Sequence, residues 1–298
     1  MRNGYSPGKL LRTAVDTEKP LQVIGVPNAF TAMMAEKTGF RALYLSGAGV
    51  ANGAFGLPDL GVTTLSDVQE EVRRITGASL LPLLVDIDTG FGGWLMIGRT
   101  IREMILAGAA GVHLEDQSSH KRCGHRAGKT LVTTGEMVDR IKAAVDARSD
   151  PDFVIMARTD AFAVEGLDAA IERAGRYREA GADMIFPEAL TMLDHYRVFA
   201  EKLGVPILAN QTEFGVTPLF TLRQMAEAEV SLVLYPLSAF RAMNAAALRV
   251  FRAIRQEGSQ QGVLDSMQTR SELYEFLDYL EYEKKLDQQP SEEDVHER

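Results

Sequence analysis

The stretch TGASLLPLLVDIDTG (residues 76–90) contains the pattern that decides the fold. A glycine follows a helical segment, a short apolar run comes next, and polar residues stand where the run ends. Glycine just past a helix permits the left-handed C-terminal cap. A run of Val, Ile and Leu without alternation is typical of a strand buried on both faces. Such strands form parallel sheets in which helices make the connections.

The same pattern recurs along the chain. Strands are expected to begin near residues 23, 42, 81, 111, 153, 184, 206 and 232, and each gap is long enough for a helix. Crossover helices are expected over 29–38, 66–76, 94–107, 134–147, 167–180, 191–203 and 221–228. Thr64 and Thr133 stand where helix N-caps are expected. Eight strand–helix units predict a (β/α)8 TIM barrel, and an open doubly wound sheet is the alternative.

The region after Arg241 has no further strand pattern. Helices are expected over 244–257 and 269–286, which is more helix than one barrel needs. These helices could pack on their own barrel or on a partner subunit. We therefore expect a single barrel domain over 1–298, with 242–286 as a C-terminal helical extension. The charged stretch 287–298 is expected to be a flexible tail.

Composition excludes several classes of protein. The 32 basic and 41 acidic residues leave a net charge of −9, which opposes binding to nucleic acid or an anionic membrane surface. The single cysteine excludes an intrachain disulfide framework. No apolar run is long enough for a membrane span, and the N-terminal residues do not read as a secretory signal. A cytoplasmic location is expected.

Polar residues gather where the expected strands end, which is where barrel enzymes carry their sites. One such residue could be a loop-entry residue or a helix cap, but seven strands at once favour a site. The residues are Asn28, Tyr44, Ser46, Asp86, Asp88, Glu115, Asp116, Arg158, Asp160, Glu188, Asn210 and Thr212.

Asp86 and Asp88 form the first candidate metal site. Alternate residues of a strand share a face, so both carboxylates are expected on one side, near Glu115 and Glu188. Unpaired carboxylates would raise one another's pKa, and a divalent cation relieves that repulsion. Oxygen ligands favour Mg²⁺. Asp-x-Asp pairs are common, so this prediction depends on the barrel.

Cys123 lies in the cationic segment KRCGHR (121–126). Neighbouring positive charge lowers a thiol pKa and makes the thiol reactive, whereas a lone cysteine is otherwise typical of a small buried residue. Gly124 suggests a mobile segment. A zinc site made of His120, Cys123 and His125 is a competing interpretation. His113 is interpreted as a buried core histidine.

Carboxylate-binding groups are also present. The glycines at 47, 49 and 53 miss the dinucleotide-loop spacing by one, but their accessible N–H groups suit carboxylates. Arg158, Arg241 and Arg270 are candidate bidentate clamps.

Together these residues resemble the isocitrate lyase/phosphoenolpyruvate mutase superfamily over nearly the whole chain. KRCGH (121–125) is the most specific motif, because the mutases and decarboxylases of the superfamily typically lack its cysteine. Isocitrate lyases are usually longer. The other motifs are YLSGAGV (44–50), GLPDLG (56–61), VDIDTGFG (85–92), HLEDQ (113–117), MARTDA (156–161), NQTEFG (210–215) and LYPLSAFRAMN (234–244).

The resemblance implies a homotetramer in which the C-terminal helices pack on a neighbouring subunit. It also implies Mg²⁺-dependent carbon–carbon cleavage of a small di- or tricarboxylate. The nearest branch converts 2-methylisocitrate to pyruvate and succinate in propionate catabolism, through the methylcitrate cycle. Isocitrate and 2,3-dimethylmalate remain alternative substrates. A zinc-dependent aldolase and a non-catalytic carboxylate binder are further alternatives.

The resemblance also implies residue roles. Asp86 and Asp88 would hold Mg²⁺, Cys123 would act as general acid, and Tyr44 would relay the hydroxyl proton. Asp59 and Glu115 would surround the metal, with Glu188 near both metal and substrate. Trp94 and Gln211 are not features of the family that we recognise. Substrate carboxylates would be bound by Ser46, Gly47, Gly124, His125, Arg158, Asn210, Thr212, Arg241 and Arg270, and an extra methyl by Phe186, Leu234 and Pro236.

Overall fold

The computed structural model describes residues 4, 6–118, 121–122, 124–126 and 128–288. The chain divides into two compact units, Met1–Arg241 and Ala242–Arg298. None of the described helices combines the length and apolarity that a membrane crossing requires.

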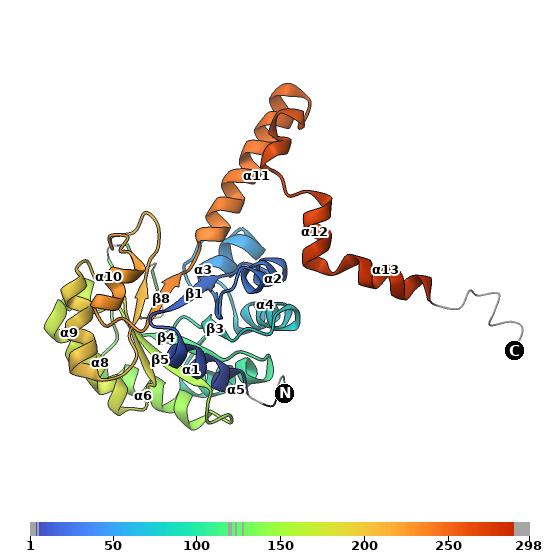
Figure 1. Ribbon diagram of the computed structural model, residues 1–298. Helices are drawn as coiled ribbons and strands as arrows, with labels where there is room; N and C mark the ends of the chain where they lie inside the picture. Colours follow the sequence, from blue (N-terminus) through green and yellow to red (C-terminus); the bar gives the residue numbers. More distant parts are fainter. Residues whose placement is uncertain (1–3, 5, 119–120, 123, 127, 289–298) are drawn as a thin grey trace, which may run out of the picture. The chain divides into compact units, whose positions relative to one another are not determined.

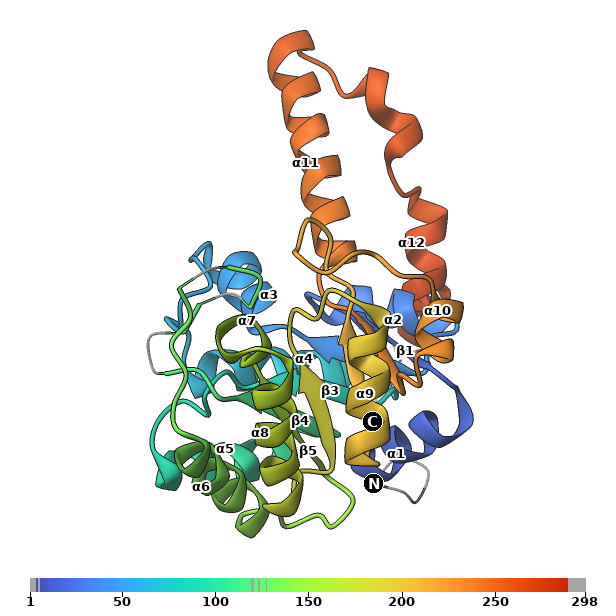
Figure 2. The ribbon, with the colours of Figure 1, turned by 90° about the vertical axis from the view of Figure 1, so that its left-hand side faces the viewer.

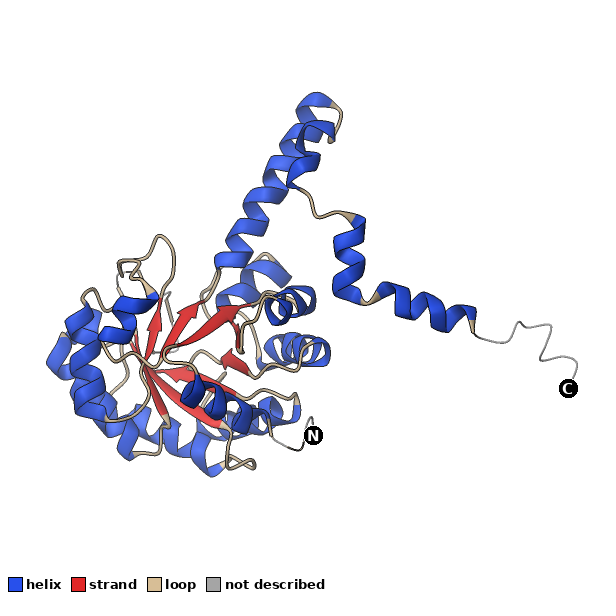
Figure 3. Cartoon of the chain, viewed as in Figure 1, coloured by secondary structure: helices blue, strands red, loops and turns tan. Residues whose placement is uncertain are grey.

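The first unit is a parallel eight-stranded barrel. The strands follow the order β6-β5-β4-β3-β2-β1-β8-β7, so the first strand pairs with both the second and the last. A parallel bridge between Ile185 and Ile207 links the two ends of that order and closes the ring. Figure 3 shows the strands in red with helices in blue around them. The predicted barrel is therefore confirmed, and the open sheet is excluded. The strands are β1 (Leu21–Gly25), β2 (Ala42–Leu45), β3 (Leu83–Asp86), β4 (Gly111–Glu115), β5 (Val154–Thr159), β6 (Met184–Pro187), β7 (Leu208–Asn210) and β8 (Leu232–Tyr235).

Helices follow the strands around the outside of the ring (Figure 1). Each expected crossover helix is present to within two residues at either end. The side chains of Thr64 and Thr133 accept the expected N-cap hydrogen bonds. The crossover helices are α2 (Ala29–Lys37), α4 (Leu65–Ala78), α5 (Trp94–Leu106), α6 (Thr134–Asp146), α8 (Leu167–Glu179), α9 (Leu193–Leu203) and α10 (Leu222–Glu227).

Four elements in the described part of the first unit were not expected from the sequence. Helix α1 (Pro7–Thr17) is capped by the side chain of Ser6, and it packs against the barrel strands. The other three stand in loops: α3 (Gly47–Gly49), a π-helical turn (Val50–Ala54) and α7 (Phe162–Glu165).

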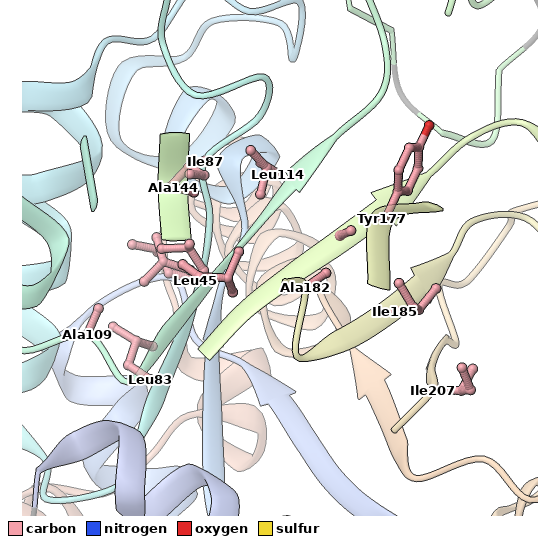
Figure 4. Close-up of a cluster of buried hydrophobic side chains, with 14 of the residues drawn as sticks. Leu45, Leu83, Ile87, Ala109, Leu114, Ala144, Tyr177, Ala182, Ile185 and Ile207 are labelled. Atoms are coloured by element: carbon pink, nitrogen blue, oxygen red, sulfur yellow. The ribbon is translucent and has the colours of Figure 1, made fainter. Parts of the chain in front are cut away.

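The apolar core has two parts. One lies between strands and outer helices, and Figure 4 shows members of it such as Leu45, Leu114 and Ile185. The other fills the barrel with alternate strand residues, and it includes Leu11 of α1. Because Leu11 is fully buried in that cluster, α1 is part of the barrel core. The view in Figure 2 shows helices and loops surrounding the strands.

The second unit is helical. Helix α11 (Ser238–Glu257) begins just before the division, and a 3-10 turn (Gln261–Ser266) follows it. The prediction of one helix over 269–286 was wrong, because α12 (Arg270–Leu277) and α13 (Tyr279–Asp287) are separated at Asp278. Asp278 has φ of 51°, a left-handed conformation that ends a helix. Among the residues of this unit that the structure describes, only Ala253 is buried.

Candidate functional site

The polar residues at the strand ends surround one small cavity of about 70 Å³. Four acidic side chains, three basic side chains and His125 line it. Most of the predicted site residues meet here: Tyr44, Ser46, Asp59, Asp86, Glu115, Gly124, His125, Arg158, Glu188, Asn210 and Thr212.

Asp86 and Asp88 lie together, but not for the reason expected. Strand β3 ends at Asp86, and Asp88 stands beyond it in a turn with φ of 50°. The two residues therefore do not share a strand face. Instead, the backbone N–H of Asp88 donates to Asp86 Oδ1 at 3.0 Å, and that of Gly47 donates to Asp86 Oδ2 at 3.0 Å. Backbone donors thus hold the carboxylate of Asp86 in place.

Burial and mutual repulsion give the two aspartates different acidities. Burial alone would raise the pKa of Asp86, but nearby His113, Lys121 and Arg158 lower it to about 2. Burial and the negative charge of Asp86 raise the pKa of Asp88 to about 6. Burial also raises the pKa of the Glu115 carboxyl well above its usual range. The acidic side of the cavity is therefore short of positive charge.

Lys121 supplies much of the positive charge that is present. Its side chain is 6% exposed, and its Nζ pairs with Asp59 Oδ1 at 2.7 Å and with Asp88 Oδ1. Burial opposes its protonation, but Asp88 and Asp86 raise its pKa. The sequence analysis treated Lys121 only as a charge beside Cys123. The motif KRC did contain this lysine, but which carboxylates it meets depends on the loop conformation.

Arg158 organises the opposite side. It forms ion pairs with Glu115 at 3.3 Å, Asp160 at 3.0 Å and Glu188 at 3.3 Å. His125 Nε2 lies 3.0 Å from Glu188, and Asn210 Nδ2 lies 3.3 Å from it. Burial opposes ionisation of Glu188, but Arg158 and His125 hold its pKa well below the usual range. The predicted clamp Arg158 is thus already engaged by three protein carboxylates.

Tyr44, which lines the cavity, is hydrogen-bonded to the buried His113. The Tyr44 hydroxyl and His113 Nε2 lie 2.8 Å apart, and both side chains are buried. Burial lowers the pKa of His113 to about 4, so the imidazole is neutral near pH 7. Burial and the charge of Asp86 raise the pKa of Tyr44 well above its usual value. His113 is buried as expected, but it also orients a residue of the site.

Cys123 and His120 lie outside the described residues, so neither the general-acid role nor the zinc alternative has a geometry here. The residues on both sides of Cys123 do line the cavity: Lys121 and Arg122 before it, Gly124 and His125 after it. Lys129 holds the following segment, because its Nζ donates to the Gly124 carbonyl at 2.6 Å and to Asp160 at 2.8 Å.

Comparison with known proteins shows which family this barrel belongs to. Residues 11–255 match the family described as phosphoenolpyruvate phosphomutase. The chain belongs to this family. It is 61% identical over 284 residues to a 2-methylisocitrate lyase of Escherichia coli (strain K12), which covers 95% of this chain and 96% of that one.

Solved structures agree. A 2,3-dimethylmalate lyase, described as a PEP mutase/isocitrate lyase superfamily member, matches with a TM-score of 0.87 and 34% identity, covering 94% of both chains. A phosphonopyruvate hydrolase in complex with oxalate and Mg²⁺ matches with a TM-score of 0.82 and 28% identity, covering 94% of this chain and 98% of that one. The family resemblance expected from the motifs is therefore confirmed.

The carboxylates of this phosphoenolpyruvate phosphomutase family member suit a hard cation. Among the described residues, no three acidic or histidine side chains enclose a metal position by themselves. Mg²⁺ usually takes one or two protein carboxylates and keeps several waters, so a smaller set is sufficient. Glu115 Oε1 is buried without a hydrogen-bond partner among the described residues. An unpaired buried carboxylate oxygen beside Asp86 fits a site that receives a cation.

Four predicted site residues that the structure describes are not part of the cavity lining, and Asp88 is one of them because it lines a second, larger cavity of about 780 Å³. Gly47 contacts it indirectly through its bond to Asp86. Arg241 pairs with Glu213 at 3.5 Å. Arg270 belongs to the second unit, where it is exposed at the start of α12.

The remaining expectations concern apolar residues and two unfamiliar ones. Phe186 and Pro236 line the cavity, whereas Leu234 is buried in the barrel interior. Gln211 is buried and accepts the Phe220 N–H at 2.7 Å, so it secures the following loop. Trp94 is exposed and lines the larger cavity of about 780 Å³. Asp88 and Lys121 line this larger cavity as well.

Proposed function

We propose that the protein is a Mg²⁺-dependent carbon–carbon lyase that cleaves 2-methylisocitrate to pyruvate and succinate. This activity would serve propionate catabolism in the cytoplasm. The 61% identity to a 2-methylisocitrate lyase favours this substrate over 2,3-dimethylmalate, whose lyase is 34% identical. The observation that carries the proposal is that the flanks of Cys123 line a cavity containing Asp86, Glu115 and Arg158.

Charge balance supports a divalent cation in this cavity. Its described lining has nearly equal numbers of acidic and basic side chains, so it does not by itself offset a trianionic substrate. Asp86 and Asp88 would hold the metal, with Asp59 and Glu115 around it. Mg²⁺ would supply Lewis-acid stabilisation of negative charge on the hydroxyl and carboxylate oxygens of the substrate.

Tyr44 and Cys123 would handle the protons. Tyr44 would relay the proton of the substrate 2-hydroxyl: its phenol would accept that proton while passing its own to the neutral His113 imidazole. The hydroxyl oxygen then forms the carbonyl of pyruvate as the carbon–carbon bond breaks, and the bonding electron pair stays on the succinate fragment. Cys123 would donate its thiol proton to that carbon as general acid. The hydroxyl proton restores the thiol, so the reaction balances.

The carboxylate-binding roles would fall to the N–H and cationic groups around the cavity. Ser46, Gly124, Asn210 and Thr212 would donate hydrogen bonds, whereas the N–H of Gly47 donates to Asp86 Oδ2 and would hold that carboxylate in place. Arg158, with its three partner carboxylates, would mainly set the positions of Glu115 and Glu188. Arg241 and Arg270 would add positive charge, Arg270 as part of a homotetramer, and His125 would contribute a hydrogen bond through Nε2.

A substrate panel tests the function. The purified protein is offered 2-methylisocitrate, isocitrate, 2,3-dimethylmalate and oxaloacetate with Mg²⁺, and pyruvate release is measured with lactate dehydrogenase and by product mass. We expect turnover of 2-methylisocitrate that EDTA abolishes, and loss of at least about a thousandfold in Cys123→Ala. Full activity of Cys123→Ala would overturn the mechanism. Stoichiometric zinc in the active protein would favour the aldolase instead.

A further inference from the structure

Lys121 lies among the acidic side chains of this site. Its ammonium contacts Asp59 and Asp88, and the charges of Asp86 and Glu115 also act on it. Two of those four carboxylates, Asp86 and Asp88, are the proposed metal ligands. An ammonium and a dication held by the same carboxylate, that of Asp88, would repel each other strongly at short range.

We propose that Lys121 is a resident counter-cation that a divalent metal ion must displace when it binds. The proposal rests on the proposed metal site. Without metal, the ammonium neutralises the buried carboxylates, whose burial as unpaired charges would be unfavourable. With metal, the dication takes over that role and the lysine side chain leaves Asp88.

The structure offers the displaced side chain a place to go. Lys121 lines both the small cavity and the larger cavity of about 780 Å³, and Asp88 also lines the larger one. The larger cavity is also lined by Glu136 and Asp139, both exposed, which can receive the ammonium. Displacement would also enlarge the small cavity, whose volume of about 70 Å³ is only a few water molecules.

Competition of this kind has a counterintuitive consequence for metal affinity. The apparent affinity of a ligand falls by the fraction of molecules in the competent state, here the fraction in which Lys121 has left. Lys121→Met removes the competitor and keeps the length of the side chain. It should therefore bind Mg²⁺ about tenfold or more tightly than the wild-type protein, even though it loses a residue of the site.

Isothermal titration of the full chain with Mg²⁺ alone, without substrate, tests this. Lys142→Met is the control, because Lys142 is an exposed residue of α6 that lines neither cavity. We expect tighter binding in Lys121→Met and a change of less than about threefold in Lys142→Met. Lys121→Gln is measured in parallel in case the methionine variant does not fold. Binding in these Lys121 variants that equals or falls below wild type would overturn the displacement.

A second measurement uses the wild-type protein. Acetylation by a small anhydride, followed by peptide mass mapping, reports how accessible each lysine is. Lys121 should become several-fold more reactive when Mg²⁺ is added, while Lys129 stays unchanged; equal protection of Lys121 with and without metal would contradict the proposal. Absence of metal binding in every variant would instead overturn the proposed metal site.

Discussion

At the scale of single residues, Gly47 shows how closely the backbone approaches the proposed metal ligands. A Cβ at this position would lie 3.1 Å from Asp86 Oδ2 and 3.1 Å from Asp88 Oδ1. Such contacts are tight, so one or both carboxylates must shift. We expect Gly47→Ala to weaken Mg²⁺ binding by about tenfold, since metal sites tolerate little ligand displacement.

The control for this experiment is Gly77→Ala. Gly77 lies in α4, where a Cβ would meet nothing within 4 Å. Alanine in a helix is favoured over glycine by roughly 0.5–1 kcal/mol, so this variant should be slightly more stable and bind metal normally. Mg²⁺ titration of both variants compares them, and unchanged affinity in Gly47→Ala would argue against Asp86 and Asp88 as ligands.

Asp160 is the buried acceptor that balances two cations. Its carboxylate lies 2.8 Å from Lys129 Nζ and 3.0 Å from Arg158 Nε, and it is fully buried. Asp160→Asn leaves both cations short of a counter-charge and should lower the free energy of unfolding by about 3–5 kcal/mol. Urea unfolding measures this, with the exposed Asp139→Asn as a control expected to stay within about 0.5 kcal/mol.

The stability that Asp160→Asn loses relative to the wild-type protein should depend on pH. Burial opposes ionisation of Asp160, but Arg158 and Lys129 lower its pKa in the folded protein. A lowered folded-state pKa adds stability that is complete above about pH 4 and is lost as the pH falls further. The difference between wild type and Asp160→Asn should therefore be large at pH 7 and shrink toward pH 3. A difference independent of pH would show that packing, not charge, is responsible.

Residue types and strand ends were enough to predict most of the cavity lining, because parallel strands bring their carboxyl ends to one rim. The detailed contacts were not predictable. Asp88 reaches Asp86 through a left-handed turn, and Lys121 reaches Asp59 across a loop. Both depend on backbone torsions outside the strands, where no periodicity constrains the chain.

At the scale of elements, the start of α4 is held by a capping box. The Thr64 side chain accepts the Asp67 N–H, and the Asp67 carboxylate accepts the Thr64 N–H at 2.7 Å. Thr64→Ala should lower the free energy of unfolding by about 1 kcal/mol. Ser66 is exposed two residues after Thr64, and Ser66→Ala should change the free energy of unfolding by less than about 0.5 kcal/mol. Equal effects in chemical denaturation would mean that the cap adds nothing.

Elements with strong apolar periodicity were predicted well, and the exceptions have physical reasons. Helix α1 was missed, although Ser6 and Pro7 are a good N-cap and first-turn pair. The interruption at Asp278 was also missed. Asp tolerates a left-handed conformation, but nothing in its neighbours demands one.

At the scale of the whole molecule, the second unit exposes many large apolar side chains. On α11 and α13 these include Phe251 (67% exposed) and Leu280 (62%). Exposed apolar helices of this extent are typical of an interface.

We expect the protein to form a homotetramer through these helices. The double variant Phe251→Asp/Leu280→Asp should dissociate the tetramer into smaller species. Light scattering after size exclusion checks this, and an unchanged mass would contradict the interface. Arg197→Asp on α9, where the arginine side chain is 42% exposed, is the control.

The fold class of the whole chain followed from counting strand–helix units, since eight such units close readily into a ring. The sequence did not predict which surface covers the C-terminal helices, because an apolar helix face has the same sequence pattern whichever surface covers it.

The pairing of β1 with β8 determines when the protein can fold during synthesis. Leu21 in the first strand pairs with Leu232 in the last, so the ring cannot close until β8 has left the ribosome. At 5–20 residues per second the ribosome takes on the order of 10–40 s to make the intervening chain. Throughout that time the barrel-facing side chains of β1, Leu21 and Val23, lack their final neighbours. The nascent chain must therefore be protected from aggregation for longer than a protein built from local contacts.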